Sequence, residues 1–562
     1  MTFDAIVVGS GMSGGWAAKE LAERGLKTLV IERGKNIEHG TDYLDAKSPW
    51  ELDNFNMVPE AEIAADYAIQ SRCYAFSPAS KHFWVKDSEH PYTTTKESPF
   101  EWIRGYHLGG RSIMWARQSY RLSEMDFESN ARDGHGVDWP IRYADLAPFY
   151  DKVETFAGIS GSVEGIAQLP DGQFLPAMAM TAPEEEFRSK LEAAFPTRRL
   201  IIGRCAHLTE AKPHHEELGR TACQYRSLCE RGCSYGAYFS SLSATLPAAQ
   251  KTGNLTIVTD AIAHSIVYDP KTGKASGVRV IDRNTKEGRT YEGRVVFLCA
   301  STIGTAQVML NSVSEAFPNG IANRSDAVGR YLTDHISGTG GSGTYPGFED
   351  QYHRGRRPNG FYIPRFRNVT EPGEGFARGY GFQGGITREN WRRGIWSEGV
   401  GAEFKAELRR PGPWKLRLSG FGEMLPRADN RVTLDRSKTD KWGLPIPHIA
   451  CTLSDNEHRM IEAINKDARA MLELAGCTDI DMRDHYGGTG LGIHEMGTAR
   501  MGKDPATSVL NKYNQAHDVP NLFVTDGSCM ASSGCQNPSL TYMAMSARGA
   551  HFAAEFLKAG KI

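Results

Sequence analysis

The chain has 562 residues, of which 40% are hydrophobic and 23% are charged. This is the composition of a folded protein with a large core and more than one domain. The formal net charge of −2 argues against nucleic acid or an acidic membrane surface as the main partner, because either would need a clustered basic excess. No stretch approaches the roughly 18 apolar residues of a membrane span, so no transmembrane segment is expected, and the first residues do not predict a signal peptide.

The first 32 residues predict one βαβ unit of a parallel sheet. A short, fully apolar run at 5–8 is typical of a buried strand, and it leads through a glycine-rich turn into a helical stretch at 16–24. A second apolar run at 28–31 ends in Glu32.

The turn of this unit carries a dinucleotide-binding pattern. Gly9, Gly11 and Gly14 form G-x-G-x-x-G, in which the glycines permit a tight turn, the close approach of a pyrophosphate and the packing of helix on strand. Glu32 is placed to accept hydrogen bonds from a ribose, and an acid at this point argues against a 2′-phosphate and hence against NADP. The motif alone does not separate NAD from FAD.

The rest of the chain alternates between weakly periodic and strand-like segments. We expect a loop-rich insertion at 40–100, strands within 255–267 and 277–283, a buried parallel strand at 295–300, a broad antiparallel sheet between 337 and 450, and a helix over 538–558.

Several blocks resemble the glucose–methanol–choline (GMC) oxidoreductases. They are Glu32-Arg33-Gly34, the segment from Arg104 to Ser112, Ala300 to Thr305, Val328 to Leu332, and nearly everything from His494 onward. The blocks follow the order of that family along the whole chain. The resemblance implies an α/β fold with a Rossmann-like FAD-binding domain, a parallel sheet with helices, and an α+β substrate domain with a broad, mostly antiparallel sheet.

The same resemblance implies that both domains are discontinuous. The FAD-binding domain is expected to comprise 1–40, 100–120, 205–335 and 485–562. The lid and substrate-binding domain is expected to comprise 41–99, 121–204 and 336–484.

The resemblance also implies which residues bind FAD. The segment 109–115 is most similar to the pyranose-oxidizing branch, some members of which attach the flavin through a histidine just before the tryptophan. Met114 stands there, so we expect FAD to be held non-covalently. The expected FAD-binding residues are Gly9, Gly11, Gly14, Glu32, Arg33, Arg104, Gly109, Gly110, Ser112, Met114, Ala263, Ala300, Ser301, Asp526, Gly527, Asn537 and Pro538.

His494 and Asn537 are the predicted catalytic pair. Removing a hydride from an alcohol carbon also requires a base for the hydroxyl proton, and a neutral histidine is suited to this at pH 7. The blocks around both residues resemble the active-site blocks of the family, which implies that His494 takes the proton and Asn537 orients the oxygen. The alternative for Asn537 is a helix cap before Pro538. We expect His335 to be structural.

Three of the ten cysteines, Cys223, Cys229 and Cys233, lie within eleven residues. Their spacing matches the bacterial ferredoxin pattern C-x2-C-x2-C-x3-C with Arg226 in the second place, and three thiolates are the number that a [3Fe–4S] cluster needs. Zinc, with help from Cys205, His207, His214 or His215, is a second interpretation. Three packing thiols are the third.

Cys223 to Ser241 resembles the catalytic subunits of bacterial glucoside 3-dehydrogenases. This implies an FAD-dependent dehydrogenase that oxidizes a secondary hydroxyl of a pyranose or glucoside, at C3, and passes electrons through the iron–sulfur cluster to a cytochrome c. A small subunit that carries a signal, and co-export with it to the periplasm, are also expected. The alternatives are a pyranose-oxidase-like enzyme that uses O2, a hydroxynitrile-type lyase, and a non-catalytic electron-transfer flavoprotein.

Overall fold

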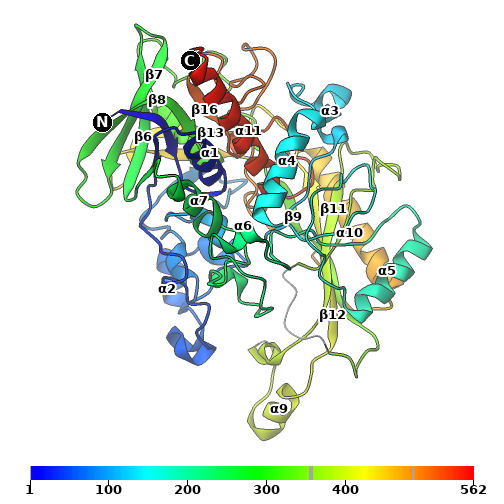
Figure 1. Ribbon diagram of the computed structural model, residues 1–562. Coiled ribbons are helices and arrows are strands. Elements are labelled where there is room, and N and C mark those ends of the chain that lie inside the picture. The colour runs from blue at the N-terminus through cyan, green and yellow to red at the C-terminus, as the bar shows by residue number, and fades with distance from the viewer. Residues whose placement is uncertain (1, 353–358, 396, 484–485) are drawn as a thin grey trace.

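A seven-stranded sheet contains the predicted βαβ unit (Figure 1). The computed structural model describes residues 2–352, 359–395, 397–483 and 486–562. The strand order of this sheet is β5-β2-β1-β8-β7-β6, and β16 pairs with the free side of part of β8. The parallel strands are β1 (Thr2–Val8), β2 (Thr28–Ile31), β5 (Leu255–Val258), β8 (Gly288–Leu298) and β16 (Leu522–Val524), and β6 (Ala261–Asp269) and β7 (Lys274–Asp282) add antiparallel pairs at one edge.

Helices pack on this sheet because its strands are apolar on both faces. All four residues of β2 are buried, as expected for a parallel sheet covered on both sides. The helix α1 (Met12–Glu23) follows the glycine turn directly, and it lies beside α11 (Ser539–Lys558), which also contacts α4 (Tyr143–Ala157).

A second, antiparallel sheet has the order β15-β9-β12-β11-β10-β4. Its strands are β4 (Ile201–Ile202), β9 (His335–Tyr345), β10 (Phe361–Ile363), β11 (Tyr380–Arg388), β12 (Trp414–Glu423) and β15 (Thr478–Arg483). The helices α5 (Ala182–Ala194) and α10 (Asp455–Leu474) share a hydrophobic core with it. The predicted fold class is confirmed.

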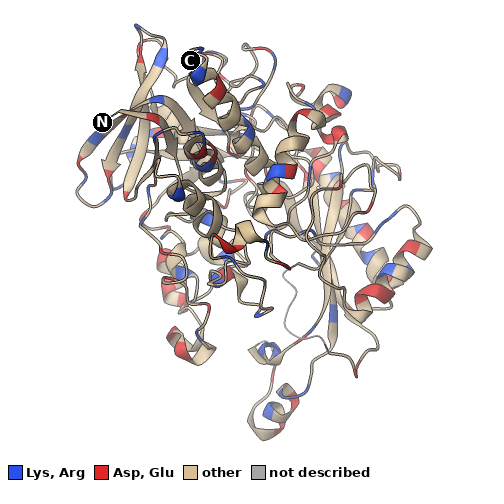
Figure 2. Ribbon diagram, viewed as in Figure 1, with Lys and Arg blue, Asp and Glu red and all other residues tan. Residues whose placement is uncertain are grey.

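The remaining elements are short. A third sheet joins β13 (Arg431–Thr439), β14 (Pro445–Ala450) and β3 (Thr93–Thr94). The other α-helices are α2 (Glu60–Asp66), α3 (Glu124–Asp133), α6 (Pro213–Glu216), α7 (Leu246–Lys251), α8 (Thr302–Asn311) and α9 (Gly401–Leu408). Lys and Arg residues are interspersed with Asp and Glu residues along the ribbon (Figure 2). Among the described residues, no helix combines the length and apolarity that crossing a membrane requires.

The strands of the two large sheets follow the predicted segments closely. Those of the first sheet fall within 1–40, 205–335 and 485–562, and those of the second fall within 121–204 and 336–484 except for the first residue of β9. The division of the chain into two domains stays a prediction.

We expect the substitution Gly14→Ala to destabilise the fold. A Cβ at Gly14 would overlap the carbonyl oxygen of Gly9, so the turn or the helix must shift at a cost of about 1–3 kcal/mol. Thermal denaturation measures this. Gly288→Ala is the control, because its Cβ would meet nothing within 4 Å; equal melting temperatures for the two variants would contradict the role of Gly14.

Candidate active site

A cavity of about 580 Å³ is lined by residues from both large sheets. The ends of β1, β2 and β8 contribute Val8, Ile31 and Cys299, whereas β11 and β12 contribute Gln383 and Phe421. Most of the predicted site residues line this cavity: Gly9, Gly11, Glu32, Arg33, Arg104, Gly110, Ser112, Met114, Ala263, Ala300, Ser301, His494, Asp526, Gly527 and Asn537. Gly14, Gly109, Pro538 and the three cysteines are not among its lining residues.

The two glycine-rich loops meet at one wall of the cavity. Ser10 Oγ donates to Glu32 Oε2 over 2.6 Å, and it accepts from the backbone nitrogen of Gly109 over 2.9 Å. Gly11 and Gly110 approach so closely that a Cβ on Gly110 would lie 3.4 Å from the Cα of Gly11. Ser10 therefore connects the βαβ turn to the predicted flavin loop, and Glu32 holds Ser10 in place in addition to the ribose contact predicted for it.

Burial and hydrogen bonding act in opposite directions on Glu32. Burial raises the pKa of its carboxyl group, while hydrogen bonds from Ser10 and Gly34 lower it. The Gly34 backbone nitrogen donates to Oε1 over 2.9 Å. Protein donors thus hold both carboxylate oxygens in place at the cavity wall.

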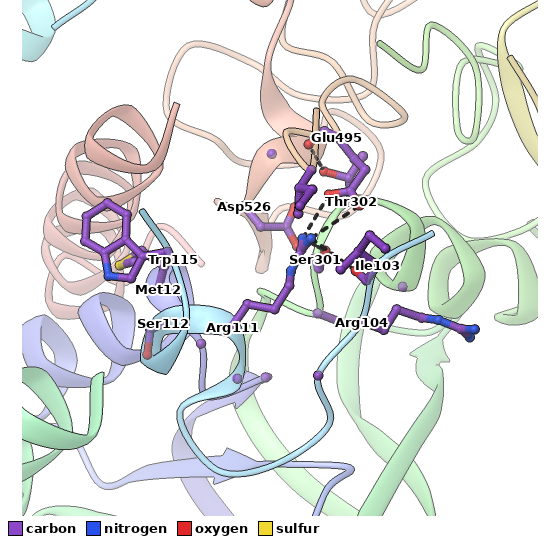
Figure 3. Close-up of a pocket in the computed structure, with 18 of the residues that line it drawn as sticks. Met12, Ile103, Arg104, Arg111, Ser112, Trp115, Ser301, Thr302, Glu495 and Asp526 are labelled. Carbon is purple, nitrogen blue, oxygen red and sulfur yellow. Dashed lines mark hydrogen bonds and ion pairs between the residues drawn. The ribbon is translucent and has the colours of Figure 1, made fainter. Parts of the chain in front are cut away.

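Arg111 and Glu495 connect the flavin loop to the segment that carries His494 (Figure 3). Arg111 Nη2 lies 2.8 Å from Glu495 Oε2, and it also donates to Ser301 Oγ over 3.3 Å. Ser301 has φ +69°, which a residue with a side chain rarely adopts. Three segments far apart in the sequence are therefore fixed around one half-buried guanidinium.

Arg104 is a second arginine at the cavity, and it is buried; its side chain points away from Arg111 (Figure 3). It lies over the ring of Trp102 at 4.3 Å, and its Nη2 is 3.7 Å from Asp87 Oδ1. Its Nε and Nη2 atoms have no hydrogen-bond partner within the described residues. A buried cation with unused donors fits an anionic ligand such as the diphosphate of FAD.

His494 faces the cavity with one ring nitrogen and contacts His335 with the other. His494 Nδ1 is 2.9 Å from His335 Nδ1, and His335 Nε2 is 2.9 Å from the carbonyl oxygen of Gly534. A carbonyl only accepts, so His335 donates with Nε2 and accepts with Nδ1. His494 then donates with Nδ1, which leaves its Nε2 as an acceptor. His335, expected to be structural, therefore determines the tautomer of His494.

Asn537 lies beside that acceptor. Its Nδ2 is 3.4 Å from His494 Nε2, and its Oδ1 accepts from Gln383 Nε2 over 2.6 Å. The helix α11 begins at Ser539 with no side-chain cap, so the Asn537 side chain is directed to His494 and not to the helix end. The structure thus brings together both members of the predicted pair.

The surroundings of His494 favour its neutral form. Burial lowers the pKa of its imidazole well below the ordinary value, and His335 and Arg111 lower it further. Burial also lowers the pKa of His335 to about 4. A neutral histidine with a bare Nε2 in a cavity can accept a proton from an alcohol.

Two family models described as GMC oxidoreductase match residues 3–337 and 426–546. The chain belongs to the GMC oxidoreductase family. Members of this family generally bind FAD, and the chain is accordingly an oxidoreductase of CH–OH donors.

Curated GMC relatives cover nearly the whole chain. The 2-methyl-1,2-propanediol dehydrogenase of Mycolicibacterium austroafricanum is 28% identical over 98% of this chain and 94% of the relative. The fructose dehydrogenase large subunit of Gluconobacter japonicus is 26% identical over 100% and 99%, and the paromamine 6'-oxidase of Streptomyces fradiae is 28% identical over 98% and 90%. The solved pyridoxine 4-oxidase from Mesorbium loti superposes with a TM-score of 0.60 over 98% of each chain at 17% identity, which is evidence for the fold alone.

The predicted cysteine site of this GMC oxidoreductase borders the cavity without lining it. Glu230, next to Cys229, is a lining residue. Cys223 Sγ lies 3.1 Å from His207 Nε2, but no three His, Cys, Asp or Glu side chains in the described part of the chain are arranged to hold a metal. All ten cysteines are free thiols.

Two buried arginines lie beside these thiols. Arg117 Nη2 is 3.9 Å from Glu230 Oε1, and in the described part of the chain its Nε and Nη1 have no hydrogen-bond partner. Burial lowers the pKa of the Arg117 guanidinium, but the Cys229 thiol and other neighbours outweigh this effect and raise that pKa above its ordinary value. Arg220 is fully buried and donates to backbone carbonyls, among them Gly236. Burial lowers the pKa of Arg220 to about 9, and the Cys233 thiol opposes that shift.

Sequence motifs do not identify Gln383, Arg117 or Glu230. Glu230 lies within the segment 223–241 that resembles the family, but the resemblance assigns it no role. Gln383 and Arg117 lie outside the blocks that resemble the family, and Gln383 stands in the middle of an ordinary strand. Only strand alternation separates Gln383 from its buried neighbour Phe382, and alternation does not reveal which face borders a cavity.

We expect the rate of flavin reduction by an alcohol substrate to change little between pH 8 and pH 6. The base is active when neutral, so activity is lost as pH falls through the folded pKa of His494, which lies well below the usual histidine value. Anaerobic stopped-flow absorbance across this range measures the rate. A half-maximal rate near the ordinary histidine pKa of about 6.5 would contradict the assignment.

Proposed function

We propose that the protein is an FAD-dependent dehydrogenase that oxidizes a secondary hydroxyl of a pyranose or glucoside, at C3, to a ketone. The observation that carries the proposal is the pair of His494 Nε2 and Asn537 Nδ2, 3.4 Å apart at the cavity wall. The substrate oxygen accepts from Asn537 while its proton passes to His494. When bound, FAD supplies the acceptor for the hydride that leaves the carbon, so that one alcohol becomes one ketone, with two electrons and one proton transferred as hydride.

A polar lining supports a sugar as the substrate. Gln118, Asn359, Gln383 and Ser419 line the cavity, and amides and hydroxyls of this kind orient a polyol through hydrogen bonds. The relatives named fructose dehydrogenase large subunit, gluconate 2-dehydrogenase flavoprotein and C-glycoside 3-oxidase also support a carbohydrate.

The cysteine loop is the proposed exit for electrons. Burying a guanidinium is costly unless an anion compensates it, and Arg117 and Arg220 both lie beside the thiols of this loop. Three thiolates that hold a [3Fe–4S] cluster would supply negative charge beside Arg220 and would add to the Glu230 carboxylate beside Arg117. Glu230, which lies between Cys229 and Cys233, lines the cavity, so the loop and the cavity share one wall.

We also propose that the protein acts as one subunit of a larger complex. One relative is named a large subunit, which supports a small partner subunit here, and a cytochrome c is the proposed acceptor. Export to the periplasm together with that subunit is part of the same proposal.

We expect His494→Ala to retain FAD but to lose about 10²–10⁴ in the rate of flavin reduction, the usual contribution of one acid–base group. An anaerobic substrate screen followed by product NMR identifies the sugar and the carbon oxidized. Wild-type reduction in His494→Ala would contradict the catalytic assignment, and a flavin that no alcohol bleaches would favour the lyase. Peroxide formed in step with product would favour the oxidase.

We expect protein purified without oxygen to contain iron and acid-labile sulfide. The cluster should give a paramagnetic signal when oxidized that disappears when substrate reduces the enzyme. Cys229→Ser should lose the iron yet keep flavin reduction in a single turnover, because His494 and Asn537 remain. Cys477→Ser is the matched control, since this partly buried cysteine is outside the loop. Iron-free wild-type protein that still reduces a one-electron protein acceptor would overturn the cluster.

A further inference from the structure

Four side chains and one carbonyl form a continuous hydrogen-bond chain between β11 and the turn before α11. Gln383 Nε2 lies 2.6 Å from Asn537 Oδ1, and Asn537 Nδ2 lies 3.4 Å from His494 Nε2. His494 and His335 then join through their Nδ1 atoms at 2.9 Å, and His335 Nε2 ends the chain on Gly534 O at 2.9 Å.

The donors of this hydrogen-bond chain all point the same way, toward Gly534. Because Gly534 presents only an acceptor, each preceding group must donate toward it, and the bare His494 Nε2 requires a donor from Asn537. An asparagine amide offers a donor on one side and an acceptor on the other. Its Oδ1 must therefore face a donor, and Gln383 provides that donor.

The contact with Gln383 is also the one that can persist when substrate binds. The 3.4 Å contact between Asn537 and His494 is long for a hydrogen bond, and an alcohol oxygen must replace it to receive the Asn537 proton donor. The 2.6 Å contact with Gln383 lies on the opposite side of the amide. It does not have to open for the substrate.

The strand β11 directs Gln383 to this position. The preceding residue, Phe382, is buried in the core shared with α5 and α10, so alternation along the strand turns Gln383 to the other face. There it pairs in register with Ser419 of β12, which also lines the cavity.

We propose that Gln383 is a positioning residue, which holds the Asn537 amide with Nδ2 toward the reacting oxygen and so makes Asn537 a donor. The inference rests on the proposed function, in which His494 and Asn537 act on the substrate hydroxyl. It adds the group that decides which end of the amide the substrate meets.

The test compares Gln383→Glu with Gln383→Leu. A carboxylate has the size of the original amide but only accepts, so it should turn Asn537 around and place two acceptors against the reacting oxygen. Leucine removes the donor but offers no acceptor that would turn the Asn537 amide around. We expect the limiting rate of flavin reduction to fall about 10²-fold in Gln383→Glu, at the low end for losing one preorganised donor, and about 10-fold in Gln383→Leu, with half-saturating substrate concentration little changed.

The order of the two variants distinguishes positioning from packing. A residue needed only for its shape would tolerate glutamate better than leucine, and that order, or wild-type rates in both variants, would overturn the inference. FAD content and melting temperature are measured for each, with Gln250→Glu, exposed on α7, as the charge control. If Gln383→Glu does not fold, a wild-type limiting rate in Gln383→Leu overturns the proposal by itself.

His494→Ala separates failure of this inference from failure of the proposed function. If His494→Ala reduces flavin slowly while both Gln383 variants reduce it at the wild-type rate, only the positioning role of Gln383 is contradicted. Normal flavin reduction in His494→Ala removes the catalytic assignment and the inference with it.

Discussion

The hydrogen bond from His335 to the carbonyl of Gly534 is the constraint on which the chemistry of the site depends. Gly534 has φ +61°, and a Cβ there would lie 2.7 Å from Leu122 Cδ2, so the turn before α11 favours glycine. The turn aims a group that only accepts at His335, and this fixes which nitrogen of His494 is bare. A proton could reverse the relation, but burial lowers the pKa of both imidazoles. Backbone geometry thus selects which nitrogen of His494, the proposed base, is free to accept a proton.

The ion pair of Arg111 and Glu495 combines a structural and an electrostatic role. Glu495 follows His494 directly, so holding Arg111 also holds the base segment against the flavin loop. Held in this way, the Arg111 guanidinium lies near His494 and lowers the pKa of the His494 imidazole. Glu495 is buried and Arg111 is half-buried, and each charge offsets the cost of removing the other from water. The contact that assembles the wall of the cavity therefore also keeps the base neutral.

Much of the fold and part of the site could be predicted because local sequence encodes them. The βαβ unit follows from apolar runs and glycine spacing, and His494 and Asn537 lie in blocks that resemble a family. The role of His335 could not be predicted, because a histidine in a similar block does not reveal what its ring contacts. Gln383 has no local signal at all: its role depends on the register of β11 and on the position of α11, which are set by contacts between distant segments.

The buried arginines beside the cysteine loop give a physical reason to consider thiolates there. A buried guanidinium without a carboxylate is not diagnostic by itself, since Arg548 is buried and donates to the carbonyl of Lys512. Arg117 and Arg220 differ from Arg548 in that three cysteines lie close together in the loop beside them, and thiols of that loop act on both arginines. A neutral thiol compensates no charge, whereas a thiolate does, and thiolates become stable in a buried site when they bind metal. Arg117 therefore makes deprotonation of Cys223 less costly, and Glu230 of the same loop lines the cavity in which we propose that the alcohol is oxidized.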